Sequence, residues 1–124
     1  MKKILVIGFI SLIGANAFGA MIKSAKLDAE NEYILIDVTY GGGCGDHKFS
    51  LKARSCFETA PVQCKANLIE DTHDPCEALI SGTVVIPLQK YGFTDPYYKD
   101  GTLTITGDKD WQTNQPSAAT VRLP

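Results

Sequence analysis

Alternating apolar and polar residues recur along this chain and predict short β-strands. The alternation is clearest from His47 to Arg54, where Phe49, Leu51 and Ala53 share one face. A second segment repeats it, with four apolar residues on one face: Val62, Cys64, Ala66 and Leu68. We expect these two segments to be half-buried strands of one antiparallel hairpin that bends near positions 60 and 61.

The strongest strand signal is the segment Tyr33 to Tyr40, which is rich in β-branched and aromatic residues. Because its apolarity is nearly continuous, we expect a central strand with both faces largely covered. The segment Gly41 to Gly45 ends this strand, since four of its five residues are glycine and glycine allows a sharp turn. A weaker pattern over Ile22 to Ala29 predicts a short first strand at a sheet edge.

Three further strands are predicted by the same patterns: Thr83–Leu88, Thr102–Thr106 and Ala119–Leu123. Pro87 has no backbone N–H, so the first of them should lie at a sheet edge. Residues 76–80 fit either a short helical turn or the beginning of that strand, while Lys90–Gly101 and Lys109–Ser117 predict loops. About seven short strands and no long helix predict an all-β fold. It should be a small antiparallel β-sandwich, of which the immunoglobulin-like arrangement is one form.

The first residues have the pattern of a secretory signal peptide. Lys2 and Lys3 precede an uncharged apolar run from Ile4 to Ala15, and an A-x-A sequence follows that ends at Ala17. We therefore expect residues 1–17 to be a signal peptide and the protein to be exported by a bacterium, to the periplasm or the medium. The apolar run is shorter than the roughly 20 residues of a spanning helix. We expect no membrane span in the mature chain.

Cleavage after Gly19 or Ala20 is the alternative to cleavage after Ala17. Residues 18–124 should form a single domain, because this length suits one hydrophobic core and is too short for two. Removing Lys2 and Lys3 leaves 10 basic against 14 acidic residues, a formal charge of −4. The charges are scattered, which disfavours a nucleic-acid partner, since such proteins cluster their lysines and arginines.

All four cysteines and both histidines lie within 33 residues, and their positions are mirror-symmetric about position 60. In order they are Cys44, His47, Cys56, Cys64, His73 and Cys76. In an exported chain, four cysteines indicate two disulfides, for which three pairings exist. The symmetry of an antiparallel hairpin favours Cys44–Cys76 with Cys56–Cys64.

The apolar faces of the hairpin conflict with this pairing by one residue. Matching them places Leu51 opposite Leu68 and Ala53 opposite Ala66, whereas a Cys56–Cys64 pair needs the neighbouring register. A one-residue slip exchanges the two faces of a strand. A loop or a β-bulge must therefore absorb one residue between the two pairs.

A metal site is the alternative use of the same residues. Cys44-x2-His47 and His73-x2-Cys76 together supply two sulfurs and two imidazoles, a tetrahedral set that suits zinc or copper. Metal-binding cysteines must be thiolates, however, and an oxidising compartment works against that state. We therefore expect no cofactor.

Five aromatic residues are concentrated in the two long loops: Tyr91, Phe93, Tyr97, Tyr98 and Trp111. On adjacent loops at one end of a sandwich they could form a platform for a sugar or a protein, since such side chains dominate binding surfaces. They could also cap the open end of the hydrophobic core. The second interpretation is the more common role of such residues.

The segments Tyr40-Gly-Gly-Gly-Cys44-Gly-Asp-His47-Lys-Phe49-Ser-Leu51 and Asp74-Pro-Cys76-Glu-Ala-Leu resemble a pattern in small exported bacterial proteins and lipoproteins. There a G-G-C-x-x-H-x-F-x-L segment precedes a strand and a C-E-A segment follows about 30 residues later. This chain has no lipobox cysteine, unlike the lipoprotein members. The resemblance implies export, a β-fold and a partnership between Cys44 and Cys76, and it implies no activity.

These patterns lead to a non-enzymatic exported protein that binds a protein or glycan partner. The alternative is a metal-binding exported domain that uses the Cys-His set. A small hydrolase is a third option, but the chain has no G-x-S-x-G elbow and no phosphate-binding glycine loop.

Overall fold

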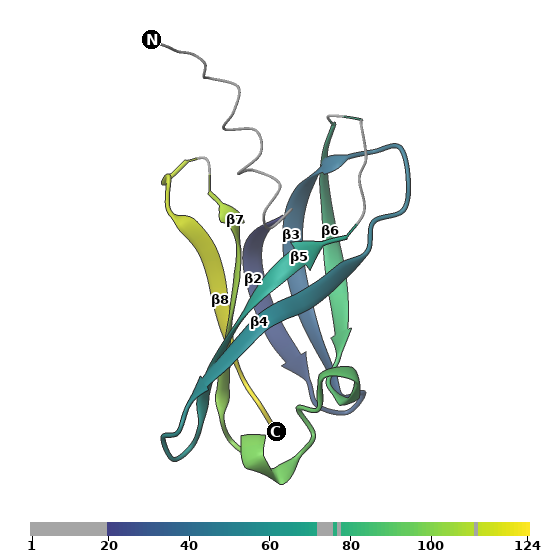
Figure 1. Ribbon diagram of the computed structural model, residues 1–124. Helices are drawn as coiled ribbons and strands as arrows, with labels where there is room; N and C mark the ends of the chain where they lie inside the picture. The colour runs from purple at the N-terminus through teal and green to yellow at the C-terminus, as the bar shows by residue number, and fades with distance from the viewer. Residues whose placement is uncertain (1–19, 72–75, 77, 111) are drawn as a thin grey trace.

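The computed structural model describes residues 20–71, 76, 78–110 and 112–124, and these form seven β-strands in two stacked sheets (Figure 1). One sheet holds β2 (Met21–Asp28), β3 (Tyr33–Gly42) and β6 (Ala78–Pro87). The other holds β4 (Phe49–Phe57), β5 (Gln63–Glu70), β7 (Thr102–Lys109) and β8 (Pro116–Arg122). In Figure 1, β4 and β5 run obliquely across the three-stranded sheet. The sequence prediction of a disulfide-linked β-sandwich with about seven strands is confirmed.

The three-stranded sheet has the order β2-β3-β6, so β3 is central and the other two strands are edges, as the sequence predicts. The prediction that both faces of β3 are largely covered is wrong. Its inner face is buried by Ile34, Ile36 and Val38, but Tyr33 and Asp37 on the outer face are exposed. Among the described residues one sheet packs against this strand, and Tyr33 on its outer face remains 38% exposed.

The four-stranded sheet has the order β4-β5-β7-β8 and contains one parallel pair, β5 with β7. A parallel pair needs a long crossover, and β6 supplies it: the chain leaves β5, adds β6 to the other sheet and returns to β7. All other strand pairs are antiparallel. This pair departs from the predicted all-antiparallel arrangement and from that of an immunoglobulin domain, whose sheets are antiparallel.

The β4–β5 hairpin reconciles the two registers that the sequence demands. Leu51 pairs with Leu68, and further along the hairpin Cys56 pairs with Cys64, with a register shift between Lys52 and Ser55. Of the two predicted possibilities, a loop or a β-bulge, the structure has the β-bulge, which absorbs one residue. The predicted pairing of Ala53 with Ala66 is wrong, because Ala53 lies in the bulge with φ of 56° and is exposed.

The hydrophobic core lies between the sheets, where alternate residues of every strand point inward. Its largest fully buried side chains are Phe93, Ile34, Ile36, Leu68, Ile86, Leu88, Leu103, Ile105 and Leu123. The two long sides of the core differ. On the side of β2, the amide of Asp108 donates to the carbonyl of Ala20, and the amide of Ile22 donates to the Oγ of Ser117. No such bond joins β4 to β6 in the part of the chain that the structure describes.

The expected signal peptide, residues 1–17, lies outside the described residues. Within them, no helix is long and apolar enough to cross a membrane.

Candidate functional site

The loop between β6 and β7, residues 88–101, lies at one end of the sandwich (Figure 1). It carries four of the five predicted aromatic residues: Tyr91, Phe93, Tyr97 and Tyr98. It folds into two short 3₁₀ turns, η1 (Gln89–Tyr91) and η2 (Pro96–Tyr98). The Asp95 carboxylate accepts a hydrogen bond from the Tyr97 amide at 2.8 Å, which caps η2. These turns hold the aromatic residues in fixed positions.

Four of the five predicted aromatic residues form a continuous series of ring contacts. The ring centroids of Tyr91 and Phe93 are 6.3 Å apart, those of Phe93 and Tyr98 are 5.2 Å apart, and those of Tyr98 and Tyr97 are 4.9 Å apart. Phe93 is fully buried, and Tyr91 and Tyr98 pack against the core. The fifth, Trp111, lies outside the described residues. The inner members of the series therefore close the end of the core.

Arg54 belongs to this cluster, although the sequence gives no sign of it. Its guanidinium lies 5.0 Å from the ring centroid of Phe93 and 5.6 Å from that of Tyr98, and it donates a hydrogen bond to the carbonyl of Tyr91. The bulge at Ala53 changes which way the following residues point. It thereby brings Arg54 over the rings, where a cation is attracted to the aromatic faces.

The outer members of the cluster face the solvent. Tyr97 is 48% exposed and packs edge-to-face on Tyr98. Its phenol donates a hydrogen bond to the Glu58 carboxylate, which raises the pKa of Tyr97 above the ordinary tyrosine value. Phe57, the neighbour of Glu58, is 57% exposed, and the Lys65 ammonium lies 5.7 Å from its ring centroid. We call Phe57, Glu58, Lys65, Tyr97 and Tyr98 together the aromatic end.

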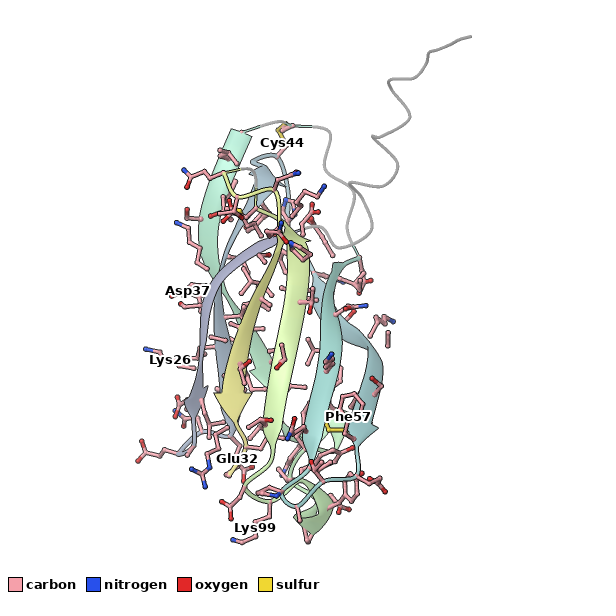
Figure 2. All side chains as sticks on the ribbon, turned by 90° about the vertical axis from the view of Figure 1, so that its left-hand side faces the viewer. Lys26, Glu32, Asp37, Cys44, Phe57 and Lys99 are labelled. Atoms are coloured by element: carbon pink, nitrogen blue, oxygen red, sulfur yellow. A yellow bond between two sulfur atoms is a disulfide. The ribbon has the colours of Figure 1, made fainter. Side chains whose placement is uncertain are left out.

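Figure 2 shows Phe57 at this end, beside the yellow bond of a disulfide. That disulfide joins Cys56 to Cys64, whose Cα atoms are 4.0 Å apart. It fixes the β4–β5 hairpin directly beside Phe57 and Glu58. The disulfide-linked hairpin therefore supports Phe57, and the buried Phe93 supports Tyr97 through the ring of Tyr98.

The second disulfide lies at the opposite end of the molecule, where Figure 2 labels Cys44. It joins Cys44 to Cys76 with a Cα–Cα distance of 5.8 Å. Both pairings that the sequence favours are thus confirmed, and no cysteine is free. Gly43, with φ of 112°, makes the turn that leads into Cys44.

The side chain of His47, a member of the alternative metal set, is 4% exposed and contacts the Glu70 carboxylate. Its ring lies 4.6 Å from that of Tyr40 and 6.5 Å from that of Phe49. His73 lies outside the described residues, and the sulfurs of the set are bonded to each other. Among the described residues no three His, Cys, Asp or Glu side chains are grouped for a metal ion.

A hollow of about 280 Å³ lies next to His47. Its walls are the inner face of β3, residues 82–85 of β6, and the side chains of His47 and Phe49. It occupies the side of the sandwich where β4 and β6 are not hydrogen-bonded, so the two sheets are incompletely packed there.

A comparison with known proteins finds no family model, no curated protein and no solved structure that matches this chain.

Proposed function

We propose that this protein is an exported, non-enzymatic β-sandwich domain that binds a protein or glycan partner through the aromatic end. One observation carries the proposal: Phe57 and Tyr97 are both about half exposed, and they flank Glu58 beside the Cys56–Cys64 disulfide and the Tyr98 ring. Exposed aromatic rings on a fixed support cost little conformational entropy to bind with, and they supply large contact areas.

The polar groups around the rings suit either class of partner. Glu58 and Lys65 place one negative and one positive charge at the margin of the aromatic surface. Binding sites commonly combine an aromatic centre with a polar rim that sets orientation. The flat faces of Phe57 and Tyr97 would contact the apolar face of a sugar ring or the side chains of a protein.

Export is supported by the leader pattern and by the two disulfides, since such bonds persist in oxidising compartments. The fold favours cleavage after Ala17 over cleavage after Ala20. Ala20 is buried, and its carbonyl accepts the hydrogen bond from the Asp108 amide. A mature chain that begins at Phe18 retains this contact.

Intact-mass measurement of the protein from a bacterial periplasm tests export and oxidation together. The expected mass is that of the reduced chain 18–124 minus four hydrogens, one pair for each disulfide. No thiol should react with an alkylating reagent. A full-length chain in the cytosolic fraction, or four reactive thiols, would refute this part of the proposal.

The binding surface is tested with a photo-crosslinking amino acid placed at position 97, and at position 33 as the control. Tyr33 is also an exposed tyrosine, but it lies on the outer face of β3. In extracts of the exporting cells, the label at position 97 should capture a defined protein that the label at position 33 does not.

Glycan binding is tested by NMR titration with soluble oligosaccharides of bacterial envelopes. Tyr97→Ala should weaken binding of whichever partner is found by roughly thirtyfold, as expected for a binding hot spot. Tyr33→Ala should leave it unchanged. Equal loss in both variants, or no specific partner for either class of probe, would refute the proposal.

A further inference from the structure

The edge strand β6 has a free edge along its whole length in the part of the chain that the structure describes. It pairs with β3 over all ten residues, Ala78 to Pro87, without any register shift. None of these ten residues is charged. An edge strand that is long, regular and uncharged offers a row of backbone N–H and C=O groups that another strand can pair with.

The other edges of the two sheets are protected. β2 has a register shift between Ile22 and Ser24, with Lys23 inside it. β4 has the bulge that contains Ala53 and Arg54. β8 lies against β2, with which Ser117 shares a hydrogen bond. Bulges, charges, prolines and coverage are the means by which proteins prevent edge-to-edge association. Among the described residues β6 has no bulge and no charge, and its proline, Pro87, stands at its last position.

The exposed apolar residues of β6 are arranged symmetrically. Leu79 and Val85 are 59% and 47% exposed, and both lie on the outer face. Gly82 is the midpoint between them. A strand with such a pattern is self-complementary, because an antiparallel copy centred on Gly82 brings each exposed apolar residue opposite the other.

We propose that β6 pairs with the β6 strand of a second copy of this chain, antiparallel and across a two-fold axis at Gly82. In this register Val85 of each copy lies opposite Leu79 of the other, and Thr83 lies opposite Ser81. The two three-stranded sheets become one six-stranded sheet. The contact is isologous and closes on itself, so it produces a dimer and not a fibre.

The inner face is compatible with the same register. Val84 lies opposite Ile80 of the second copy, on the face of β6 that borders the hollow beside His47. The added side chains therefore extend along a part of the core where the sheets are incompletely packed.

The chemistry of the edge selects a second copy over a strand of other composition. A charged segment would place a charge opposite Leu79 or Val85 and so lose the apolar cross-strand pair there. The required partner is an uncharged extended segment with exposed apolar residues six positions apart. β6 itself meets this description. In a dimer, each copy of β6 is both the edge strand and the strand that pairs with it.

The mass of the mature protein in solution tests the proposal, measured by light scattering during gel filtration over a concentration series. The wild-type protein should be a dimer. Val85→Lys should raise the dimer dissociation constant about tenfold, because the two-fold axis removes the Val85–Leu79 pair at two sites and a lysine on an edge strand disfavours strand pairing. Val85 is half exposed, so its replacement should leave the thermal unfolding of the monomer unchanged.

Ala118→Lys is the matched control. It adds the same charge at an exposed position of β8, outside the proposed interface, and should leave the dimer intact. A wild-type protein that is monomeric at all concentrations, or a dimer that Val85→Lys does not weaken, would overturn the proposal. So would a series of growing oligomers, because a two-fold contact closes.

Cysteine cross-linking tests the register. In the double variant Leu79→Cys with Val85→Cys, oxidation should link positions 79 and 85 of different copies, since opposing Cα atoms in a sheet lie within disulfide range. Within one chain these positions are about 20 Å apart along the strand. Each single variant should give no covalent dimer, because equivalent positions are equally far apart. Linkage in a single variant, or none in the double variant, refutes this register.

Discussion

The two long sides of the sandwich are built differently. On the side of β2, backbone contacts join the sheets: the amide of Asp108 lies 2.6 Å from the carbonyl of Ala20, and the Oγ of Ser117 lies 2.9 Å from the amide of Ile22. Gly107 approaches the same carbonyl so closely that no side chain fits between them. On the side of β4 and β6 the sheets are separated by a hollow.

Among the described residues, side chains cover the β4–β6 side at one end. The phenol of Tyr91 accepts a hydrogen bond from the amide of Leu51 at 3.0 Å, and Arg54 donates to the carbonyl of Tyr91. The β2 side therefore contributes stability through hydrogen bonds of the backbone between the sheets, whereas the β4–β6 side leaves the edge of β6 and the aromatic end accessible. Both proposed binding surfaces belong to the second side.

The largest expected difference in the free energy of unfolding is between two glycine-to-alanine substitutions, one on each side of the sandwich. At Gly107 a Cβ would lie 2.5 Å from the carbonyl oxygen of Ala20, so Gly107→Ala must displace backbone and should lower the free energy of unfolding by about 2–3 kcal/mol. At Gly82 the nearest atom is 3.8 Å away, on the Tyr40 ring. Gly82→Ala should therefore leave stability unchanged or raise it by about 0.5 kcal/mol, because alanine loses less backbone entropy in a strand.

Urea unfolding of both variants, followed by circular dichroism, gives this comparison. Equal destabilisation of the two would mean that the side of β6 is as tightly closed as the side of β2.

A smaller effect is expected from removing one hydroxyl on each side. Ser117 is buried, and its Oγ accepts from the Ile22 amide and donates to the Asp108 carbonyl. Ser117→Ala leaves both backbone groups without this partner and should cost about 1.5 kcal/mol. Ser81→Ala, at an exposed position of β6, should change stability by less than about 0.5 kcal/mol. The same unfolding experiment applies, and a near-zero effect of Ser117→Ala would contradict the closure of this side.

The smallest effect concerns the exposed contact between Tyr97 and Glu58. The carboxylate accepts a hydrogen bond from the phenol, so the folded state favours the neutral phenol, and the pKa of Tyr97 is raised above the ordinary value of 10.0. The contact therefore stabilises the fold below the unfolded tyrosine pKa, and this contribution is lost as the pH rises through the higher folded value. Glu58→Gln should lower the pKa of Tyr97 towards its ordinary value.

Phenolate absorbance during alkaline titration measures this change, and Tyr97→Phe identifies the band that belongs to position 97. A titration that Glu58→Gln leaves unaltered would show that the phenol does not donate to Glu58 in solution.

Much of the hairpin was predictable from residue patterns. The facing of Leu51 with Leu68 follows from the alternation, and the two disulfides follow from the symmetric positions of the cysteines. The conflict between these registers predicts that a loop or a β-bulge absorbs one residue, but not which of the two, nor where. Arg54 could not be identified as part of the aromatic cluster, because its direction depends on the left-handed conformation of Ala53, a residue that seldom adopts it.

The contacts between distant segments were not predictable in the same way. The segment after Cys76 fitted a helical turn as well as a strand, and only pairing with β3 makes β6 begin at Ala78. The parallel pairing of β5 with β7 is likewise absent from any local pattern.

The sequence alone determined most of the strands, the buried face of the β4–β5 hairpin and the favoured cysteine pairs, because side-chain alternation and cysteine spacing are local properties of the chain. The tertiary structure decided which sheet edges are joined and which one stays open. It also decided which aromatic rings are buried, such as Phe93, and which face the solvent, such as Tyr97. The physical reason is that these hydrogen bonds and ring contacts join residues that are far apart in the chain. Their relative positions are set only when the two sheets pack on each other.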